Sequence, residues 1–421
     1  MSNRREFLSR SALTLGAFAC GETLLTSDSR VSWGHHAFAE ENQMSNMIGA
    51  YGSWAADLVG DGPAKLSFRR PEFTNVNAWR QTARQRLSEC LQQPPVVAPR
   101  EVRVEKQGER DGVMIERVSW QLDYGPRTEA LLLKPVASSG PLPAILALHD
   151  HGGNKFFGHA KITQTLQPIH PIMQTHQTEY YGGVAWANEA AKRGYAVLVP
   201  DAFTFGSRRV KMEDLPPAAR RNVEPVTGDS VDDVRAYNRF AADHEHLMAK
   251  SLFCAGTTWP GVFSSEDQRA LDYLCSRDDI AADRVGCAGL SGGGLRTVFL
   301  AGIDDRIRCA CCVGMMTTWR DYLLHKAHTH TWMVYVPGLP RDLDYPEILG
   351  LRAPLPTLVQ NNNGDDLFTL SEMQRADDIL REVFAKANAV EAYRCSFYDG
   401  PHKFNLAMQA EAWDWFDKWL S

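Results

Sequence analysis

The pentapeptide Gly289-Leu290-Ser291-Gly292-Gly293 constrains this chain more than any other feature. Residues 284–290 form an apolar run typical of a buried strand, and residues 292–301 have the pattern of a helix. So sharp a strand-to-helix turn strains the backbone of its central serine and exposes the hydroxyl. We therefore expect Ser291 to be a nucleophile, with the Gly292 amide donating to a developing oxyanion. The alternative is a glycine-rich turn that merely begins a helix.

Two later loops supply the base and the carboxylate that a serine nucleophile needs. The apolar segment 356–360 leads into Asp365-Asp366, and the segment 393–398 leads into His402. Of the 13 histidines, His402 is the only one in the final strand-to-helix loop, so we expect it to be the general base. We prefer Asp365 as its partner, because the apolar pair Leu367-Phe368 should turn inward and leave Asp366 in solvent. Asp366 remains the alternative.

The loop from His149 to Gly153 follows an earlier strand, where a second oxyanion donor is expected. Its glycines permit close backbone approach. The amide of His151 is the first candidate and that of Gly152 the second. The histidines of this loop could suggest a metal, but they lack further ligands, and we expect neither a metal nor a cofactor. The later histidines predict a polar segment near the site: His325, His328 and His330.

The order of apolar segments predicts an α/β fold, with a mostly parallel central sheet and helices on both faces. Antiparallel strands precede it at 102–106, 113–122 and 128–135. The later strands are expected at 143–148, 195–200, 284–290, 307–313, 356–360 and 393–398. The helices are expected at 185–193, 233–254, 265–275, 292–301, 370–387 and 406–420. The start at Ser265 rests on the polar run Ser264-Ser265-Glu266-Asp267, which suits a helix N-terminus.

The N-terminus has the pattern of an export signal. Arg4-Arg5-Glu6-Phe7-Leu8 is a twin-arginine sequence, residues 11–19 form a short apolar run, and cleavage is expected before Glu40. Lipidation of Cys20 is the alternative. We therefore expect a signal peptide over 1–39, a helical extension over 40–100 and a catalytic domain over 101–421. The mature protein would be periplasmic or extracellular.

The net charge of the chain limits the kinds of partner that it can bind. The net charge of -6 disfavours nucleic acid and anionic membranes as partners, because both select basic surfaces, and favours a small-molecule or carbohydrate substrate.

Nine cysteines could suggest disulfides in an exported protein. Most of them lie in apolar segments, and twin-arginine cargo normally folds in the reducing cytoplasm. Buried free thiols are therefore the preferred interpretation.

Over residues 100–420 the chain resembles the α/β-hydrolases related to acetyl xylan esterases and dienelactone hydrolases. The matching motifs are Leu148-His149-Asp150-His151-Gly152-Gly153, Asp283-Arg284-Val285-Gly286, Gly289-Leu290-Ser291-Gly292-Gly293, Asp304-Asp305-Arg306-Ile307, Asp365-Asp366-Leu367-Phe368 and Asp399-Gly400-Pro401-His402-Lys403-Phe404. The resemblance implies an α/β-hydrolase fold and hydrolysis of a carboxylic ester through an acyl-enzyme, with an acyl group on a plant-type polysaccharide as one candidate substrate. An exported serine peptidase and a non-catalytic binding protein of the same fold are the alternatives.

Three departures from these families bear on the details. Asp150 replaces the usual loop glycine, which affects the oxyanion geometry. Dienelactone hydrolases carry cysteine where this chain has Ser291, and glucuronoyl esterases carry arginine where it has Gly292. An insertion over residues 155–183 is expected to cover the site. The candidate pocket residues are Phe156, Phe157, Tyr180, Tyr181, Trp259, Met315, Met316 and Trp319.

Overall fold

A computed structural model describes residues 46–95, 97–137 and 140–421. These residues belong to one compact unit, Ser45–Ser421. The predicted twin-arginine segment, its cleavage site and Cys20 lie outside the described residues. No helix within the described ranges is both long and apolar enough to cross a bilayer.

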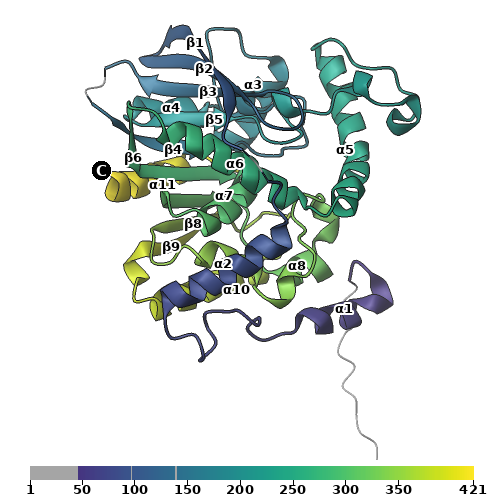
Figure 1. The fold of residues 1–421 in the computed structure, drawn as a ribbon, viewed down its shortest axis with the longest axis vertical. Coiled ribbons are helices and arrows are strands. Elements are labelled where there is room, and N and C mark those ends of the chain that lie inside the picture. Colours follow the sequence, from purple (N-terminus) through teal and green to yellow (C-terminus); the bar gives the residue numbers. More distant parts are fainter. Residues whose placement is uncertain (1–45, 96, 138–139) are drawn as a thin grey trace, which may run out of the picture. The chain divides into compact units, whose positions relative to one another are not determined.

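One mixed sheet organises the described part of the chain, in the order β1-β2-β3-β5-β4-β6-β7-β8-β9 (Figure 1). The neighbours β1, β2, β3 and β5 pair antiparallel. In the rest of the sheet order, from β5 through β4 to β9, all neighbours pair parallel. The strands are β1 (Arg100–Arg110), β2 (Val113–Gln121), β3 (Thr128–Pro135), β4 (Leu142–Ala147), β5 (Ala196–Pro200), β6 (Ile280–Leu290), β7 (Ile307–Val313), β8 (Thr357–Asn362) and β9 (Tyr393–Tyr398). The predicted α/β architecture is confirmed.

Alternate residues of the strands enter two separate hydrophobic cores. In β4, Ala144 and Leu146 belong to one core, and Ile145 and Ala147 belong to the other. This alternation follows from the period of two in an extended chain, so the strands β2 to β9 contribute apolar side chains to both faces, whereas β1 is mostly exposed and contributes to neither. Helices cover both faces, as the continuous apolar runs of the sequence predict.

The helices divide between these faces. Those with residues in the first core are α2 (Val76–Leu91), α5 (Val231–Cys254), α6 (Trp259–Cys275), α7 (Gly292–Ile303), α8 (Trp319–Leu324), α9 (Tyr345–Gly350) and α10 (Leu370–Lys386). Those with residues in the second are α3 (Pro171–Tyr181), α4 (Trp186–Lys192) and α11 (Leu406–Leu420). The short α1 (Gly52–Val59) precedes them in the chain.

Four helices differ from the sequence predictions. The predicted start of a helix at Ser265 is wrong, because α6 begins at Trp259. The Thr258 side chain caps it by accepting a hydrogen bond from the Gly261 amide, and Pro260 suits the first turn, where its missing N–H costs nothing. No helix is predicted from the sequence at α3, α8 or α9. The N-terminus of α3 is capped by the side chain of His170.

The N-terminal helix α2 packs against helix α6, where the Thr258 hydroxyl donates to the carbonyl of Leu91 at 2.8 Å. Its residues Trp79, Ala83 and Leu87 are buried in the first core, and the Trp79 indole donates to the carbonyl of Leu66 at 2.6 Å. Its N-terminus is capped by Asn75, whose side chain accepts hydrogen bonds from the amides of Asn77 and Ala78. The segment therefore contributes to the same core as the sheet.

Candidate active site

Ser291 lies at the junction of β6 and α7, with φ 57° and ψ −118°. A positive φ is rare and strained for a residue with a side chain. The turn is held in place because the Ser291 amide donates to the carbonyl of Val313, on the neighbouring strand, at 2.9 Å. The strained serine that the motif predicts is present in the structure.

The glycines around Ser291 are required by close backbone packing. A Cβ on Gly289 would lie 2.4 Å from the carbonyl oxygen of Leu148, and one on Gly293 would lie 2.0 Å from the same atom. A Cβ on Gly294 would lie 2.7 Å from that of Met315. Side chains at these positions would push the turn away from the ends of β4 and β7.

His402 and Asp365 meet at the carboxyl ends of β8 and β9. The His402 Nδ1 lies 2.5 Å from the Asp365 Oδ2, and the other Asp365 oxygen accepts from the Leu367 amide at 3.0 Å. Asp365 is buried, whereas Asp366 is exposed. The structure therefore brings Asp365, and not Asp366, to the histidine. Since the Asp365 carboxylate accepts a hydrogen bond from the Nδ1–H of His402, Nε2 is left as the basic nitrogen.

The end of β7 brings Ser291 and His402 to one place. Ser291 bonds to Val313, and a Cβ on the next residue, Gly314, would lie 3.0 Å from the Cε1 atom of His402. The Nε2 atom of His402 is buried and has no hydrogen-bond partner among the described residues. Ser291 and His402 also line the same cavity, of about 230 Å³. This cavity is the candidate active site.

Two backbone amides lie where an oxyanion could form. A Cβ on Gly292 would lie 2.9 Å from the His151 nitrogen, so the loop after β4 contacts the start of α7. Within the described chain, neither the His151 nor the Gly292 amide donates a hydrogen bond to the protein. The amide of Gly152, the second candidate of the loop, also makes no such bond in the described chain, but of the two amide nitrogens only that of His151 is among the atoms nearest to a Cβ on Gly292. The geometry therefore favours the amides of Gly292 and His151.

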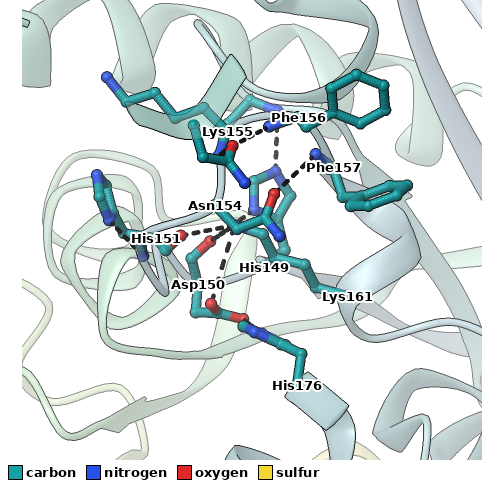
Figure 2. Close-up of polar contacts among 12 residues, drawn as sticks. His149, Asp150, His151, Asn154, Lys155, Phe156, Phe157, Lys161 and His176 are labelled. Carbon is teal, nitrogen blue, oxygen red and sulfur yellow. Dashed lines mark hydrogen bonds and ion pairs between the residues drawn. The ribbon is translucent and has the colours of Figure 1, made fainter. Parts of the chain in front are cut away.

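A buried lysine fixes the orientation of this loop (Figure 2). Lys161 is fully buried, and its Nζ donates to the carbonyl oxygens of Asp150 at 2.7 Å and His151 at 2.8 Å. In a trans peptide the carbonyl and the next N–H point in opposite directions. By holding the Asp150 carbonyl from one side, Lys161 directs the His151 N–H to the other. Burial lowers the pKa of Lys161 to about 8, although Asp150 and Asp201 act against this.

Asp150 is the buried carboxylate beside Lys161. Its Oδ1 accepts from the His176 Nε2 at 3.1 Å and from the Tyr181 hydroxyl, and its Oδ2 lies 3.9 Å from the Lys161 Nζ. Burial by itself raises the pKa of Asp150, but His176 and Lys161, together with the hydrogen bonds, outweigh burial and hold it well below its ordinary range. Asp150 is therefore an ionised counter-charge to Lys161, which explains why an acidic residue occupies this loop position.

The His151 side chain forms a hydrogen bond to a carboxylate on helix α5. Its Nδ1 accepts from the Gly153 amide at 3.0 Å, so Nε2 carries the proton and lies 3.1 Å from the Glu245 Oε1. The same carboxylate oxygen pairs with Lys155 at 2.7 Å. Burial lowers the pKa of the His151 imidazole. The side chain therefore anchors the loop to helix α5.

The pocket predictions are confirmed for two residues only. Tyr180 and Met315 line the 230 Å³ cavity. The remaining candidates do not line it and lie in or against the hydrophobic cores: Phe156, Phe157, Tyr181, Trp259, Met316 and Trp319. His330 also lines the cavity, with the threonines on either side of it, whereas His325 and His328 do not. Burial lowers the pKa of His330 to about 4, so its ring is neutral at neutral pH.

The described cysteines are all free, and those of the predicted apolar segments are buried: Cys287, Cys309, Cys311 and Cys312. Burial raises the pKa of each of these thiols, so they are unreactive at neutral pH. No group of three or more potential metal ligands is found within the described ranges. The His149 ring accepts a hydrogen bond from the Ala202 amide at 3.1 Å, which is a structural use of that residue.

Comparison with solved structures settles the architecture. A "putative acetyl xylan esterase" from Bacteroides fragilis superposes with a TM-score of 0.62 at 19% identity, covering 83% of this chain and 82% of that one. A glucuronoyl esterase from Solibacter usitatus superposes with a TM-score of 0.57 at 16% identity, covering 85% of this chain and 97% of that one. This chain has the α/β-hydrolase fold. In such a fold the ends of the central strands carry the site, as they do here.

Sequence comparison gives one further relative of this α/β-hydrolase-fold chain. "Putative hydrolase YtaP" of Bacillus subtilis (strain 168) is 26% identical over 340 residues, which cover 80% of this chain and 98% of that protein. No protein-family model matches the sequence.

Proposed function

We propose that this protein is a serine hydrolase that cleaves carboxylic esters. The hydrogen bond between His402 and Asp365, in a cavity that also contains the strained Ser291, carries the proposal. The three residues follow strands in the order serine, acid, histidine that the fold uses for acyl transfer. The relatives named as a hydrolase and as esterases support the same reaction.

The geometry assigns a role to each group. The Ser291 Oγ attacks the ester carbonyl carbon while the His402 Nε2 takes its proton, and Asp365 stabilises the resulting imidazolium. The oxyanion is stabilised by the amides of Gly292 and His151. The protonated histidine then gives its proton to the departing alcohol, leaving an acyl-serine. Water, deprotonated by the same histidine, releases the acid and restores Ser291.

We propose a short acyl group on a carbohydrate as the natural substrate. The acid component must fit a cavity of about 230 Å³, part of whose lining is apolar, including Leu295, Met315 and Val334. An acetyl xylan esterase-like activity matches this size and the name of one structural relative. Gly292, in place of the arginine of glucuronoyl esterases, argues against a substrate that needs that cation.

A fluorophosphonate probe tests the proposal directly. Incubation of the purified protein should add one probe mass per chain, and proteolysis should place it on the peptide containing Ser291, because only an activated serine reacts. Hydrolysis of 4-nitrophenyl acetate should stop as the label accumulates. An unlabelled protein without esterase activity would instead identify a non-catalytic member of the fold, and peptide-amide cleavage without ester cleavage would identify a peptidase.

We also propose export by the twin-arginine route, on the strength of Arg4-Arg5 and the apolar residues 11–19. The full chain expressed in a bacterium with an intact twin-arginine pathway should appear in the periplasm or medium. Replacing both arginines with lysine should retain it in the cytoplasm. Equal export of the two forms would rule out this route.

A further inference from the structure

A second, larger cavity adjoins the candidate active site. It has a volume of about 790 Å³ and shares Gly152, Gly153 and Tyr180 with the 230 Å³ cavity. Cavities of several hundred Å³ are large enough for small organic ligands. Tyr180 lies beside the catalytic histidine, and its ring centroid is 6.4 Å from that of His402. A ligand that reaches from Ser291 past Tyr180 would therefore enter the larger cavity.

Hydrogen-bond donors dominate one wall of this larger cavity. Arg235 and Arg239 lie one turn apart on α5, both exposed, and both line it. Asp232 lies 3.7 Å from Arg235, and Arg239 has no ion-pair partner in the part of the chain that the structure describes. Glu179 also lines the cavity, and because Asp232 already pairs with Arg235, Arg239 is the lining cation of the described chain that is left to bind an anion.

Two carboxamides add donors of fixed orientation. The Asn238 Oδ1 accepts from the amides of Lys155 and Phe156 at 2.9 and 3.0 Å, and the Asn154 Oδ1 accepts from Phe157 at 3.3 Å. With both oxygens occupied, each Nδ2 remains as a donor, and neither bonds to another described residue. Asn154 is only 5% exposed and lines the cavity. A ligand rich in acceptors would satisfy these groups.

We infer that this cavity is a subsite for an acidic saccharide, a sugar that carries a carboxylate or a sulfate group, on the alcohol side of the scissile ester. The anionic group would bind Arg239 and Arg235, since guanidinium groups match the geometry of carboxylate and sulfate oxygens. The sugar oxygens would accept from Asn154 and Asn238, and Glu179 would accept from a sugar hydroxyl. The inference rests on the proposed function for its orientation, but the binding itself does not require hydrolysis.

Calorimetry with non-hydrolysable probes separates the two proposals. Methyl galactopyranosiduronate or the 6-sulfate of methyl galactopyranoside should bind the intact protein saturably, and neutral methyl galactopyranoside should bind much more weakly. The better of the two anions shows which group the subsite prefers. Affinity should fall as sodium chloride is raised, because the arginines are exposed to screening. Equal binding of the neutral and anionic sugars, or no binding of any, would overturn the subsite.

The variant Arg239→Gln should weaken binding of the preferred anion about fivefold, because a charged hydrogen bond is lost at a solvent-exposed site. Arg103→Gln is the matched control, since Arg103 lies on β1 with 73% of its side chain exposed and should leave binding unchanged. Unchanged affinity in Arg239→Gln would place the anion elsewhere and overturn the proposal. Hydrolysis of 4-nitrophenyl acetate, measured in parallel, tests the esterase function independently.

Discussion

Replacing Ser291 with alanine is expected to lower kcat/KM for 4-nitrophenyl acetate by about 10⁴-fold or more, because the acyl group then has no oxygen on which to form the intermediate. The folded structure should persist, since the substitution removes one hydroxyl oxygen and the strained backbone is held by the bond between the Ser291 amide and Val313. Initial rates measured beside a thermal unfolding curve check both statements.

The control for Ser291→Ala is Ser276→Ala, a serine at the end of α6 outside both cavities. It should retain the wild-type rate. If Ser291→Ala kept more than a small fraction of the rate in a folded protein, the acyl-enzyme mechanism on this residue would be wrong. The residual rate of Ser291→Ala should resemble that of the oxyanion site acting on bound substrate alone.

Replacing Asp150 with alanine is expected to lower the free energy of unfolding by about 3 kcal/mol, because Lys161 is then a buried cation without its nearest carboxylate. The His151 amide should also lose its fixed direction, and kcat should fall by about 10-fold or more. Urea unfolding and steady-state kinetics measure the two effects. Stability reduced with kcat unchanged would show that the network supports the fold and not the oxyanion site.

The difference in unfolding free energy between the wild type and Asp150→Ala is expected to depend on pH in a definite direction. The pKa of Asp150 lies below its ordinary range in the folded protein, so the ionised carboxylate stabilises the fold above its unfolded pKa of about 3.9. The gap between the wild type and Asp150→Ala should therefore be complete at neutral pH and shrink as the pH falls below about 4. The double variant Asp150→Ala, Lys161→Met should be more stable than the single variant, because it removes the uncompensated cation.

The parts of this site that the sequence predicts are those with a local signature. Ser291 is marked by glycines whose close packing the structure demonstrates, and His402 by its position after the last strand. The preference for Asp365 over Asp366 was also derivable, because Leu367-Phe368 indicates which way the loop turns, and the structure brings Asp365 to the histidine. Strand positions followed in the same way from apolar runs of the length that a buried strand needs.

The unpredicted parts depend on contacts between distant segments. In the sequence, Lys161 has no feature that distinguishes it from the other polar residues of the segment 155–183. Nothing near it indicates that its amine donates to two carbonyls of the His149–Gly153 loop. The sequence predicts too late a start for α6, because Ser264 and Ser265 suit an N-cap, whereas the cap in the structure is Thr258. His330 was expected only as part of a polar segment, and its place in the cavity depends on how the region between β7 and β8 folds back.

The anchoring of the oxyanion loop by Lys161 has a consequence for redesign. The segment 155–183, which is predicted from the sequence to be an insertion, lines both cavities and is also the source of the amine that holds the His151 backbone. Exchanging this insertion for one from another esterase would then alter substrate preference and turnover at the same time. A chimera that retains catalysis must carry over a cation at this depth together with the acidic residue that neutralises it.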